Sequence, residues 1–496
     1  MTVKNNNDTI AAVSTPNGVG GIAVIRISGP DAISTINSAW EGTDLESVKS
    51  HTLHLGKYYS LEGNLLDEGI ASVFRAPASF TGENVVELSV HGSAWIQREV
   101  LADLIKRGAR IANPGEFTQR AFLNGKIDLA QAEGVADLIA SSSKAAHDLA
   151  ISQVKGLFSK EFNLLRDKLI EFASLLELEL DFSEEDVEFA DREALLNLCS
   201  RILGKINSLA ASYSKGAVLK NGVPVVIAGI PNAGKSSLLN LLLNDDKAIV
   251  TDIPGTTRDI IEDTIELDGI LYRFIDTAGL RSTTDKVEGI GVDRARESMK
   301  KAFIIIWVID TTAQIEKQVK ELNDFKENHP SKNIIIILNK TDISGHRFYN
   351  EEMKDGISFS TLSRQGMSEL IDSLHKSVKA NSNPEQDLIV TNARHYEALL
   401  RASEALTRAK QALSPASYTS PTSSDSNTQS SGIFPGISHL QRQATDNLPH
   451  DFTTHVSVDF IAQDIREAIS HLSVITGSIT TEDLLTSIFS NFCIGK

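Results

Sequence analysis

The sequence predicts a multidomain protein with an N-terminal α/β domain, an α-helical bundle domain built from two chain segments, and a second α/β domain inserted between those segments. Three observations lead to this prediction. The 496 residues exceed what one compact core accommodates. From about residue 219 to 378, β-rich runs alternate with helical patterns, which is typical of a parallel sheet covered by helices. Helical periodicity precedes this region and returns after about residue 385.

The composition narrows the classes of protein that fit. A hydrophobic fraction of 41% is ample for globular folding, and a formal net charge of −17 argues against a broad surface that grips nucleic acid without specificity. The two cysteines, Cys199 and Cys493, are too distant for a disulfide framework, which favours a reducing compartment. We see no signal peptide and no run of about 18 apolar residues, so we expect a cytoplasmic protein without a membrane span.

We place the domain boundaries at 1–125, 126–218, 219–380 and 381–496. In the first domain, Ile22–Ile27 and Val85–Val90 are β-rich runs bounded by glycines, and a helical pattern follows each. This texture predicts a mixed α/β unit.

The two helical segments are expected to pack together, because neither has an obvious complete core. In the first, apolar residues recur at helical spacing at Leu164, Leu165, Leu169, Phe172, Leu175 and Leu176. In the second, Ala393–Leu413 is helical, a Ser/Thr/Pro-rich stretch over about 414–450 is expected to be a disordered insertion, and a last pair of helices follows. Thr480 with Asp483 resembles a capping box for the final helix.

The strongest motif is the phosphate loop Gly229-Ile230-Pro231-Asn232-Ala233-Gly234-Lys235-Ser236, which follows the predicted strand Val223–Ala228. We expect the helix to start at Ser237. The glycines let backbone N–H groups surround the β-phosphate, and the helix N-terminus adds a favourable dipole. Lys235 is expected to reach the β- and γ-phosphates, and Ser236 to place a hydroxyl on Mg²⁺.

Three further elements follow in the order that a nucleotide switch needs. Asp276-Thr277-Ala278-Gly279 is expected to hold Mg²⁺ through water and to sense the γ-phosphate. Asn339-Lys340-Thr341-Asp342 ends a predicted strand, and its last carboxylate can accept hydrogen bonds from guanine that adenine cannot offer. Ser358-Phe359-Ser360 is placed where a loop would support the base. Together these elements predict a Ras-like P-loop G domain that hydrolyses GTP.

The hydrolytic machinery is predicted to depart from that of many small GTPases. Leu280 stands where those proteins carry a glutamine that positions water. The amide oxygen of Asn232, with backbone carbonyls of Thr251 and Ile253, could instead bind a monovalent cation that does the work of an arginine finger. A threonine of the same segment, Thr257, is expected to complete the Mg²⁺ shell.

The chain resembles the MnmE (TrmE) family of tRNA-modification GTPases over nearly its whole length. The matching segments are the phosphate loop, Gly255-Thr256-Thr257-Arg258-Asp259, Asp276-Thr277-Ala278-Gly279-Leu280-Arg281, Ser79-Phe80-Thr81-Gly82-Glu83-Asn84, Asn113–Lys126 and Phe492-Cys493-Ile494-Gly495-Lys496. The last three make the resemblance specific, since a G domain alone would match dozens of families.

The resemblance implies a homodimer whose N-terminal domains bind a one-carbon donor, 5-formyl- or methylene-tetrahydrofolate. The matching folate contacts are Arg26, Glu87, Lys126 and Lys496; from the residues alone they would be ordinary solvated charges. It further implies K⁺ held by Asn232, Thr251, Ile253 and Thr256, and Mg²⁺ held by Ser236 and Thr257. Glu288 matches the acid that orients the attacking water, which gives Glu288, Asn232 and Lys235 as the catalytic set. Cys493 matches the family's C-terminal cysteine.

The family acts with the flavoprotein MnmG, in a heterotetramer or larger complex, to place a carboxymethylaminomethyl or aminomethyl group on C5 of wobble uridine in certain tRNAs. The expected GTP contacts are Asn232, Ala233, Gly234, Lys235, Ser236, Ser237, Thr251, Asp252, Ile253, Pro254, Gly255, Thr256, Thr257, Asp276, Thr277, Ala278, Gly279, Asn339, Lys340, Asp342, Ser358, Phe359 and Ser360. Two alternatives are a ribosome-associated regulatory GTPase and a scaffold in which nucleotide is structural. The single G domain and the chain ends count against the first, and the intact Lys235, Ser236 and Thr257 against the second.

Overall fold

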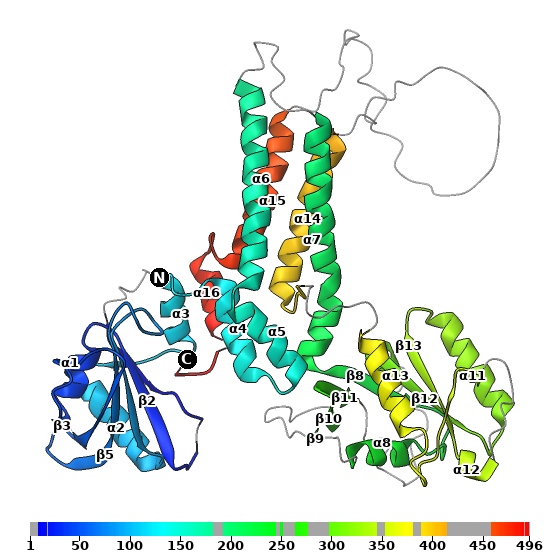
Figure 1. Cartoon of the computed structure of the whole chain (residues 1–496), viewed down its shortest axis with the longest axis horizontal. Helices are drawn as coiled ribbons and strands as arrows, with labels where there is room; N and C mark the ends of the chain where they lie inside the picture. Colours follow the sequence, from blue (N-terminus) through cyan, green and yellow to red (C-terminus); the bar gives the residue numbers. More distant parts are fainter. Residues whose placement is uncertain are drawn as a thin grey trace, which may run out of the picture. The chain divides into compact units, whose positions relative to one another are not determined.

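The computed structural model describes residues 8–16, 18–181, 192–244, 249–250, 263–275, 297–344, 353–379, 388–413, 458–490 and 492–495 (Figure 1). Chain contacts divide the molecule into two compact units. The smaller contains Asn163–Ala210 and Glu397–Ser473, and the larger contains the rest. The expected insertion at about 414–450 lies outside the described residues. Within the described part, no helix combines the length and apolarity that a membrane crossing needs.

The N-terminal region forms one seven-stranded sheet in the order β3-β4-β5-β6-β2-β1-β7, and every neighbouring pair is antiparallel except β1 with β7. The strands are β1 Ile10–Val13, β2 Ile22–Ser28, β3 Trp40–Gly42, β4 Thr52–Tyr59, β5 Leu65–Phe74, β6 Val85–His91 and β7 Arg110–Ile111. The helices are α1 Ala32–Asn37, α2 Ala94–Lys106 and α3 Glu116–Leu123. The predicted mixed α/β unit is confirmed.

The two faces of this sheet differ in what covers them. Ile25, Ile27 and Leu88 point to the face on which α1 and α2 pack, and they belong to one buried core. Because strand side chains alternate, Arg26 and its cross-strand partner Glu87 point to the opposite face. That second face therefore carries two of the charged residues named in the sequence analysis, Arg26 and Glu87.

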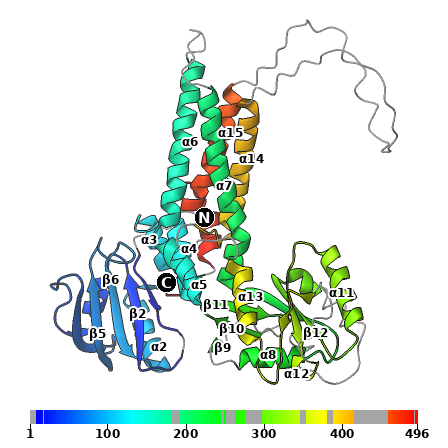
Figure 2. The same ribbon diagram turned by 45° about the vertical axis from the view of Figure 1, so that its right-hand side comes forward.

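The smaller unit is a bundle of four helix segments that lie side by side (Figures 1 and 2). They come from α6 Leu157–Asp181, α7 Arg192–Asn221, α14 Ala393–Leu413 and α15 Val458–Thr476. Leu165, Leu169 and Phe172 are buried in α6, as their spacing predicts, whereas Leu164 is 50% exposed. One residue therefore falls off the buried stripe, because each residue turns the helix by about 100°. The predicted packing of the two helical chain segments is confirmed.

Three shorter helices complete the helical region: α4 Leu129–Ala140, α5 Lys144–Val154 and α16 Glu482–Phe489. The cap of α16 differs from the prediction. Thr481, not Thr480, is the N-cap, and its hydroxyl accepts a hydrogen bond from the backbone N–H of Leu484. The helix starts one residue later than the sequence pattern suggested, with two acidic residues in its first turn.

The inserted α/β domain has a second seven-stranded sheet, in the order β14-β13-β12-β8-β11-β10-β9. The strands are β8 Val223–Ala228, β9 Ile249–Val250, β10 Asp263–Leu267, β11 Ile270–Phe274, β12 Ile304–Asp310, β13 Asn333–Asn339 and β14 Ile357–Ser358. The predicted parallel sheet is found from β14 to β11, while β10 and β9 add an antiparallel edge.

Helices cover both faces of this sheet. They are α8 Lys235–Leu243, α11 Ile315–Asn328, α12 Thr341–Ser344 and α13 Met367–Lys379. One buried core lies between the sheet and α8 with α13, and a second contains Val319 and Leu322 of α11. All seven residues of β12 are buried, as expected for a central parallel strand.

Candidate functional site

The phosphate loop joins β8 to α8, and two observations explain its shape. Gly234 has φ +98° and caps α8, so the helix starts at Lys235, two residues earlier than predicted. A Cβ atom at Gly234 would lie 2.2 Å from Nδ2 of Asn339. Only glycine therefore allows this turn and this close approach of β13's last residue.

The Lys235 ammonium group folds back over the loop. Its Nζ donates hydrogen bonds to the backbone oxygens of Gly229, at 2.9 Å, and Ile230, at 2.7 Å. Burial lowers the pKa of Lys235 from its ordinary value. A partly desolvated cation at a helix N-terminus is well suited to anionic phosphate oxygens.

Asn232 and Ser236 flank this cation. Asn232 is exposed and has φ +61°, a left-handed conformation that asparagine tolerates better than most residues. Ser236 is half-buried in the first turn of α8, and Ser237 beside it is exposed. The loop and the first turn of α8 thus carry one amide and two hydroxyl groups close to Lys235 in the sequence.

The Asn339–Asp342 segment is bonded to the phosphate loop. The Asn339 side chain is 1% exposed, and its Nδ2 donates to the backbone oxygen of Ala233 at 2.8 Å. Lys340 has φ +67°, and its Nζ lies 2.6 Å from Oδ2 of Asp310. Asp342 is exposed on α12. The structure therefore brings both predicted motifs to the carboxyl ends of the parallel strands, where α/β proteins bind ligands.

Asp310 is a residue that the sequence analysis missed. It ends β12, and its carboxylate accepts from the Thr312 backbone N–H, at 2.8 Å, as well as from Lys340. Burial raises the pKa of Asp310, but these hydrogen bonds outweigh burial and leave it below its usual value. The sequence signal that could have identified Asp310 is a single carboxylate directly after the apolar run Ile304–Ile309.

The Ser358–Ser360 loop is attached to the same segment. The Phe359 backbone oxygen accepts from the hydroxyl of Thr341 at 2.9 Å, and the Phe359 N–H donates to Leu338. Phe359 is fully buried in the core and both of its backbone polar groups are bonded within the protein, so it holds the loop against the Asn339–Asp342 segment. Ser360 is also fully buried.

Several predicted site residues lie outside the described residues. They are Thr251, Asp252, Ile253, Pro254, Gly255, Thr256, Thr257, Asp276, Thr277, Ala278, Gly279, Glu288 and Lys496.

A second group of predicted residues gathers in the N-terminal domain. Arg26 donates to Glu87 through Nε at 2.9 Å, and its Nη2 lies 2.7 Å from the same oxygen. The guanidinium carbon lies 5.4 Å from the ring centre of Phe80 and 5.6 Å from that of Phe117. Lys126 donates to the backbone oxygen of Pro77 at 3.0 Å.

The C-terminal segment is bound to this domain. The Ser14 hydroxyl donates to the backbone oxygen of Gly495 at 3.0 Å, and the Gly115 N–H donates to that of Cys493 at 3.3 Å. A Cβ at Gly115 would lie 2.7 Å from the backbone oxygen of Phe489, so glycine permits this approach. Cys493 is an exposed free thiol. The last described residues thus lie against β1 and the start of α3.

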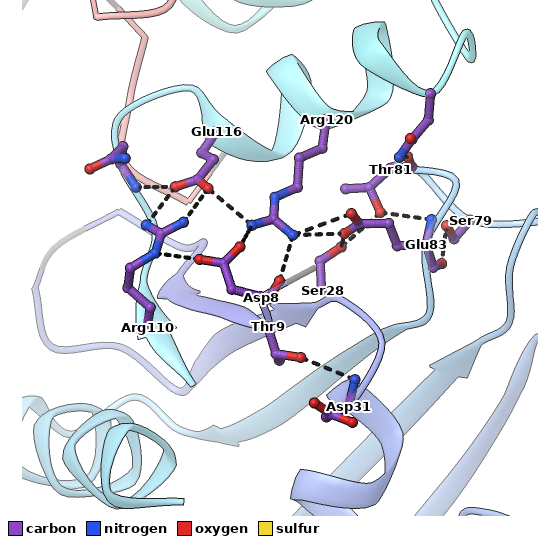
Figure 3. A network of polar contacts seen from close by, with 12 residues as sticks. Asp8, Thr9, Ser28, Asp31, Ser79, Thr81, Glu83, Arg110, Glu116 and Arg120 are labelled. Atoms are coloured by element: carbon purple, nitrogen blue, oxygen red, sulfur yellow. Dashed lines mark hydrogen bonds and ion pairs between the residues drawn. The ribbon is translucent and has the colours of Figure 1, made fainter. Parts of the chain in front are cut away.

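A network of polar contacts in the same domain links β2, α3 and the connection from β5 to β6 (Figure 3). Arg120 of α3, 2% exposed, is at its centre. The sequence analysis included Arg120, Glu83 and Glu116 in matching segments without assigning them a role. Arg120 forms ion pairs with Asp8, Glu83 and Glu116.

Two family models, which cover different parts of the chain, and many relatives match this protein. The family model described as the GTP-binding protein TrmE N-terminus matches residues 9–126, and the one described as the MnmE helical domain matches 129–424 and 437–493. The tRNA modification GTPase MnmE of Cytophaga hutchinsonii is 45% identical over 498 residues, covering 100% of this chain and 99% of the relative. The protein of the same name from Bacteroides fragilis is 45% identical over 505 residues, covering 99% and 100%.

Among solved structures, the G domain of the T. maritima FeoB iron transporter aligns with 31% of this chain and 98% of its own at 25% identity. The TM-score of 0.24 is too low to add to the assignment.

Proposed function

The chain belongs to the MnmE family of tRNA modification GTPases, and we propose from this premise that it hydrolyses GTP to drive the modification of C5 of wobble uridine in tRNA. The observation that carries the proposal is the bond between Asn339 and Ala233, which makes the guanine-selecting motif and the phosphate loop one continuous site. Asp342, exposed three residues further on, is the guanine-reading carboxylate.

In the proposed mechanism, bound Mg²⁺ and K⁺ assist GTP hydrolysis in the G domain. When bound with the nucleotide, Mg²⁺ would neutralise negative charge that develops on the phosphates. The half-buried Ser236 hydroxyl, next to Lys235, fits one Mg²⁺ ligand, and Thr257 supplies the other. The exposed Asn232 amide at the loop's rim fits a K⁺ ligand, together with Thr251, Ile253 and Thr256. Glu288 orients the attacking water.

The proposed one-carbon donor is 5-formyl- or methylene-tetrahydrofolate, held in the N-terminal domain by Arg26, Glu87, Lys126 and Lys496. Three described features support this fit. The Arg26–Glu87 pair supplies donors and an acceptor side by side, Phe80 adds an aromatic face, and Lys126, past the end of α3, bonds to the loop that carries Phe80. When bound, the folate supplies the carbon that becomes part of the uridine substituent.

The open sheet face supports the proposed homodimer. Leu53 and Leu55 of β4 are 71% and 68% exposed, and Ile70, opposite Leu55 on β5, is 39% exposed. They share the face of Arg26 and Glu87. A second copy covering this face would bury apolar area beside the folate site. The flavoprotein MnmG and tRNA complete the proposed assembly, a heterotetramer or larger complex.

The test is mass spectrometry of wobble uridine in tRNA from cells that lack this protein. We expect the C5 substituent to disappear and to return when the wild-type chain is supplied, but not when the Lys235→Ala chain is supplied. Unchanged nucleosides in the deletion strain would contradict the proposed function. Full modification with Lys235→Ala would show that GTP hydrolysis is not required.

A further inference from the structure

Glu83 belongs to the buried network around Arg120, and its carboxylate is bound on two sides (Figure 3). Its Oε2 accepts from the Ser28 hydroxyl at 2.6 Å, and both of its oxygens lie 3.2 Å from Nη1 of Arg120. Ser28 is on β2, two residues beyond Arg26, so it points to the same sheet face. Glu83 therefore connects β2 and α3.

In the connection from β5 to β6, residues 75–84, Arg75 at the start bonds to the backbone oxygens of Leu45, Glu46 and Val48, and the charged residue of the remaining part, 76–84, is Glu83. The segment is folded on itself around it. The Ser79 hydroxyl donates to the Glu83 backbone oxygen at 2.6 Å, and the Thr81 hydroxyl accepts from the Glu83 N–H at 3.2 Å. Asn124, past the end of α3, donates to the Thr81 backbone oxygen at 2.7 Å. The Glu83 carboxylate is thus the ionic anchor of this loop.

The anchored loop carries two contacts of the proposed folate residues. Phe80 presents its ring to the Arg26 guanidinium, and the Pro77 backbone oxygen accepts from Lys126. Phe80 and Pro77 are uncharged, so neither can form an ion pair that would hold the loop. The loop therefore supplies one contact to Arg26, beside that residue's pair with Glu87, and one to Lys126.

The residues of α3 in this network also contact the proposed folate residues. Arg120 and Phe117 are on α3, and the Phe117 ring lies on the Arg26 guanidinium. Gly115, the N-cap of α3, holds the C-terminal segment that leads to Lys496. Burial raises the pKa of Glu116, but hydrogen bonds from Arg110, the Asn113 backbone N–H and Arg120 outweigh burial and leave the pKa below its usual value. The charged carboxylate pairs with Arg120 within α3 and with Arg110, which links α3 to β7.

We propose that Glu83 is a positioning residue for the one-carbon-donor site: through Arg120 and Ser28 it holds the 76–84 loop so that Phe80, Arg26 and Lys126 keep one arrangement. This inference rests on the proposed function, since it names what organises that site. Glu83 does not touch the folate. Its side chain is 13% exposed and its oxygens are taken by Ser28 and Arg120.

The test measures binding of 5-formyltetrahydrofolate to the full chain by isothermal titration calorimetry, alongside the thermal midpoint. Glu83→Gln keeps an oxygen for Ser28 but removes the charge facing Arg120, and Glu83→Ala removes both. Arg120 retains Asp8 and Glu116, so both variants are expected to fold. We expect Kd to rise by about tenfold for Glu83→Ala and less for Glu83→Gln, as for loss of a charge-assisted hydrogen bond.

The matched control is Asp103→Asn. Asp103 is another buried carboxylate of this domain, 2% exposed, but its partners Tyr58 and Arg107 lie outside the network. We expect it to lower the thermal midpoint at least as much as Glu83→Ala while leaving Kd within about twofold, because additivity holds for independent sites. Equal Kd values for wild type and Glu83→Ala would overturn the proposal, as would a control that weakens binding in proportion to its lost stability.

Hydrogen exchange separates failure of this inference from failure of the proposed function. Faster exchange over 76–84 in Glu83→Ala than in Asp103→Asn is the expected result. A wild-type chain that binds no folate overturns the folate part of the proposed function, and the exchange rates then decide alone whether Glu83 anchors the loop. Unchanged exchange overturns the anchoring.

Discussion

Arg394 and Glu133 are 261 residues apart in the sequence and form a two-pronged ion pair. Nε of Arg394 donates to one Glu133 oxygen at 2.9 Å, and Nη2 donates to the other at 2.8 Å. Nε2 of His395 lies 2.7 Å from the second oxygen. The pair joins α4, before the inserted G domain, to α14, after it. It therefore links the chain segment before the G domain directly to the segment after it.

Glu133→Gln should destabilise the protein strongly, because Arg394 is left partly buried without its counter-charge. We expect a loss of about 3 kcal/mol in urea unfolding followed by circular dichroism at pH 7. Glu397→Gln is the control, since Glu397 and its partner Arg401 are largely exposed. That change should cost under about 0.5 kcal/mol, and equal losses would refute the role of burial.

The Glu133 carboxylate should make the free energy of unfolding depend on pH. Burial raises the pKa of Glu133, but His395 and Arg394 outweigh burial and lower it from 4.5 to about 2. A folded pKa below the unfolded one means that the stabilisation is complete above about pH 4.5 and disappears as the pH falls towards 2. The difference in unfolding free energy between wild type and Glu133→Gln should shrink over that window. A constant difference would show that the charge is not the cause.

Gly234→Ala should disrupt the nucleotide site, because the new Cβ collides with Nδ2 of Asn339 and the residue has a positive φ. We expect GTP affinity to fall by more than about tenfold in a fluorescent-nucleotide titration. Gly204→Ala is the control: Gly204 lies in α7 with nothing within 4 Å of its Cβ position. Alanine there should leave binding unchanged and stabilise the helix by up to about 1 kcal/mol.

Asp342→Asn should change which base is bound. Guanine offers a 2-amino group to the carboxylate, whereas xanthine has an oxygen at that position and can accept from an asparagine amide. We expect GTP to bind at least about a hundredfold more weakly and XTP to bind more tightly than in wild type. Competition titrations with both nucleotides measure this. Unchanged preference would mean that Asp342 does not contact the base.

Asn232→Ala should abolish the dependence of GTP turnover on K⁺. In the wild type, we expect turnover in KCl to exceed that in NaCl by at least about tenfold, since a bound cation replaces an arginine finger. Asn244→Ala is the control, because Asn244 is an exposed asparagine at the end of α8 whose amide donates to the backbone oxygen of Asn240 in the same helix. Equal wild-type rates in the two salts would refute the cation proposal.

The short motifs were readable because their parts are close in the sequence. The phosphate loop, the Asn339–Asp342 segment and the alternation of β8, β12 and β13 with helices were all predicted. Each depends on backbone conformation or on residues next to one another, which local spacing reveals. The start of α8 at Lys235 and the antiparallel edge β10–β9 were missed, since a cap and a sheet edge depend on what packs nearby.

By itself, the sequence determined the three-part architecture, the phosphate loop and the place of the Asn339–Asp342 segment after a strand. The tertiary structure alone decided which charges are buried. Nothing in the spacing of Arg120, Glu83 or Glu133 distinguishes them from the solvated charges around them. They lose water because strands and helices distant in the chain close over them, and each is stable there only because opposite charges arrive from other segments. Burial and pairing are properties of the assembled fold.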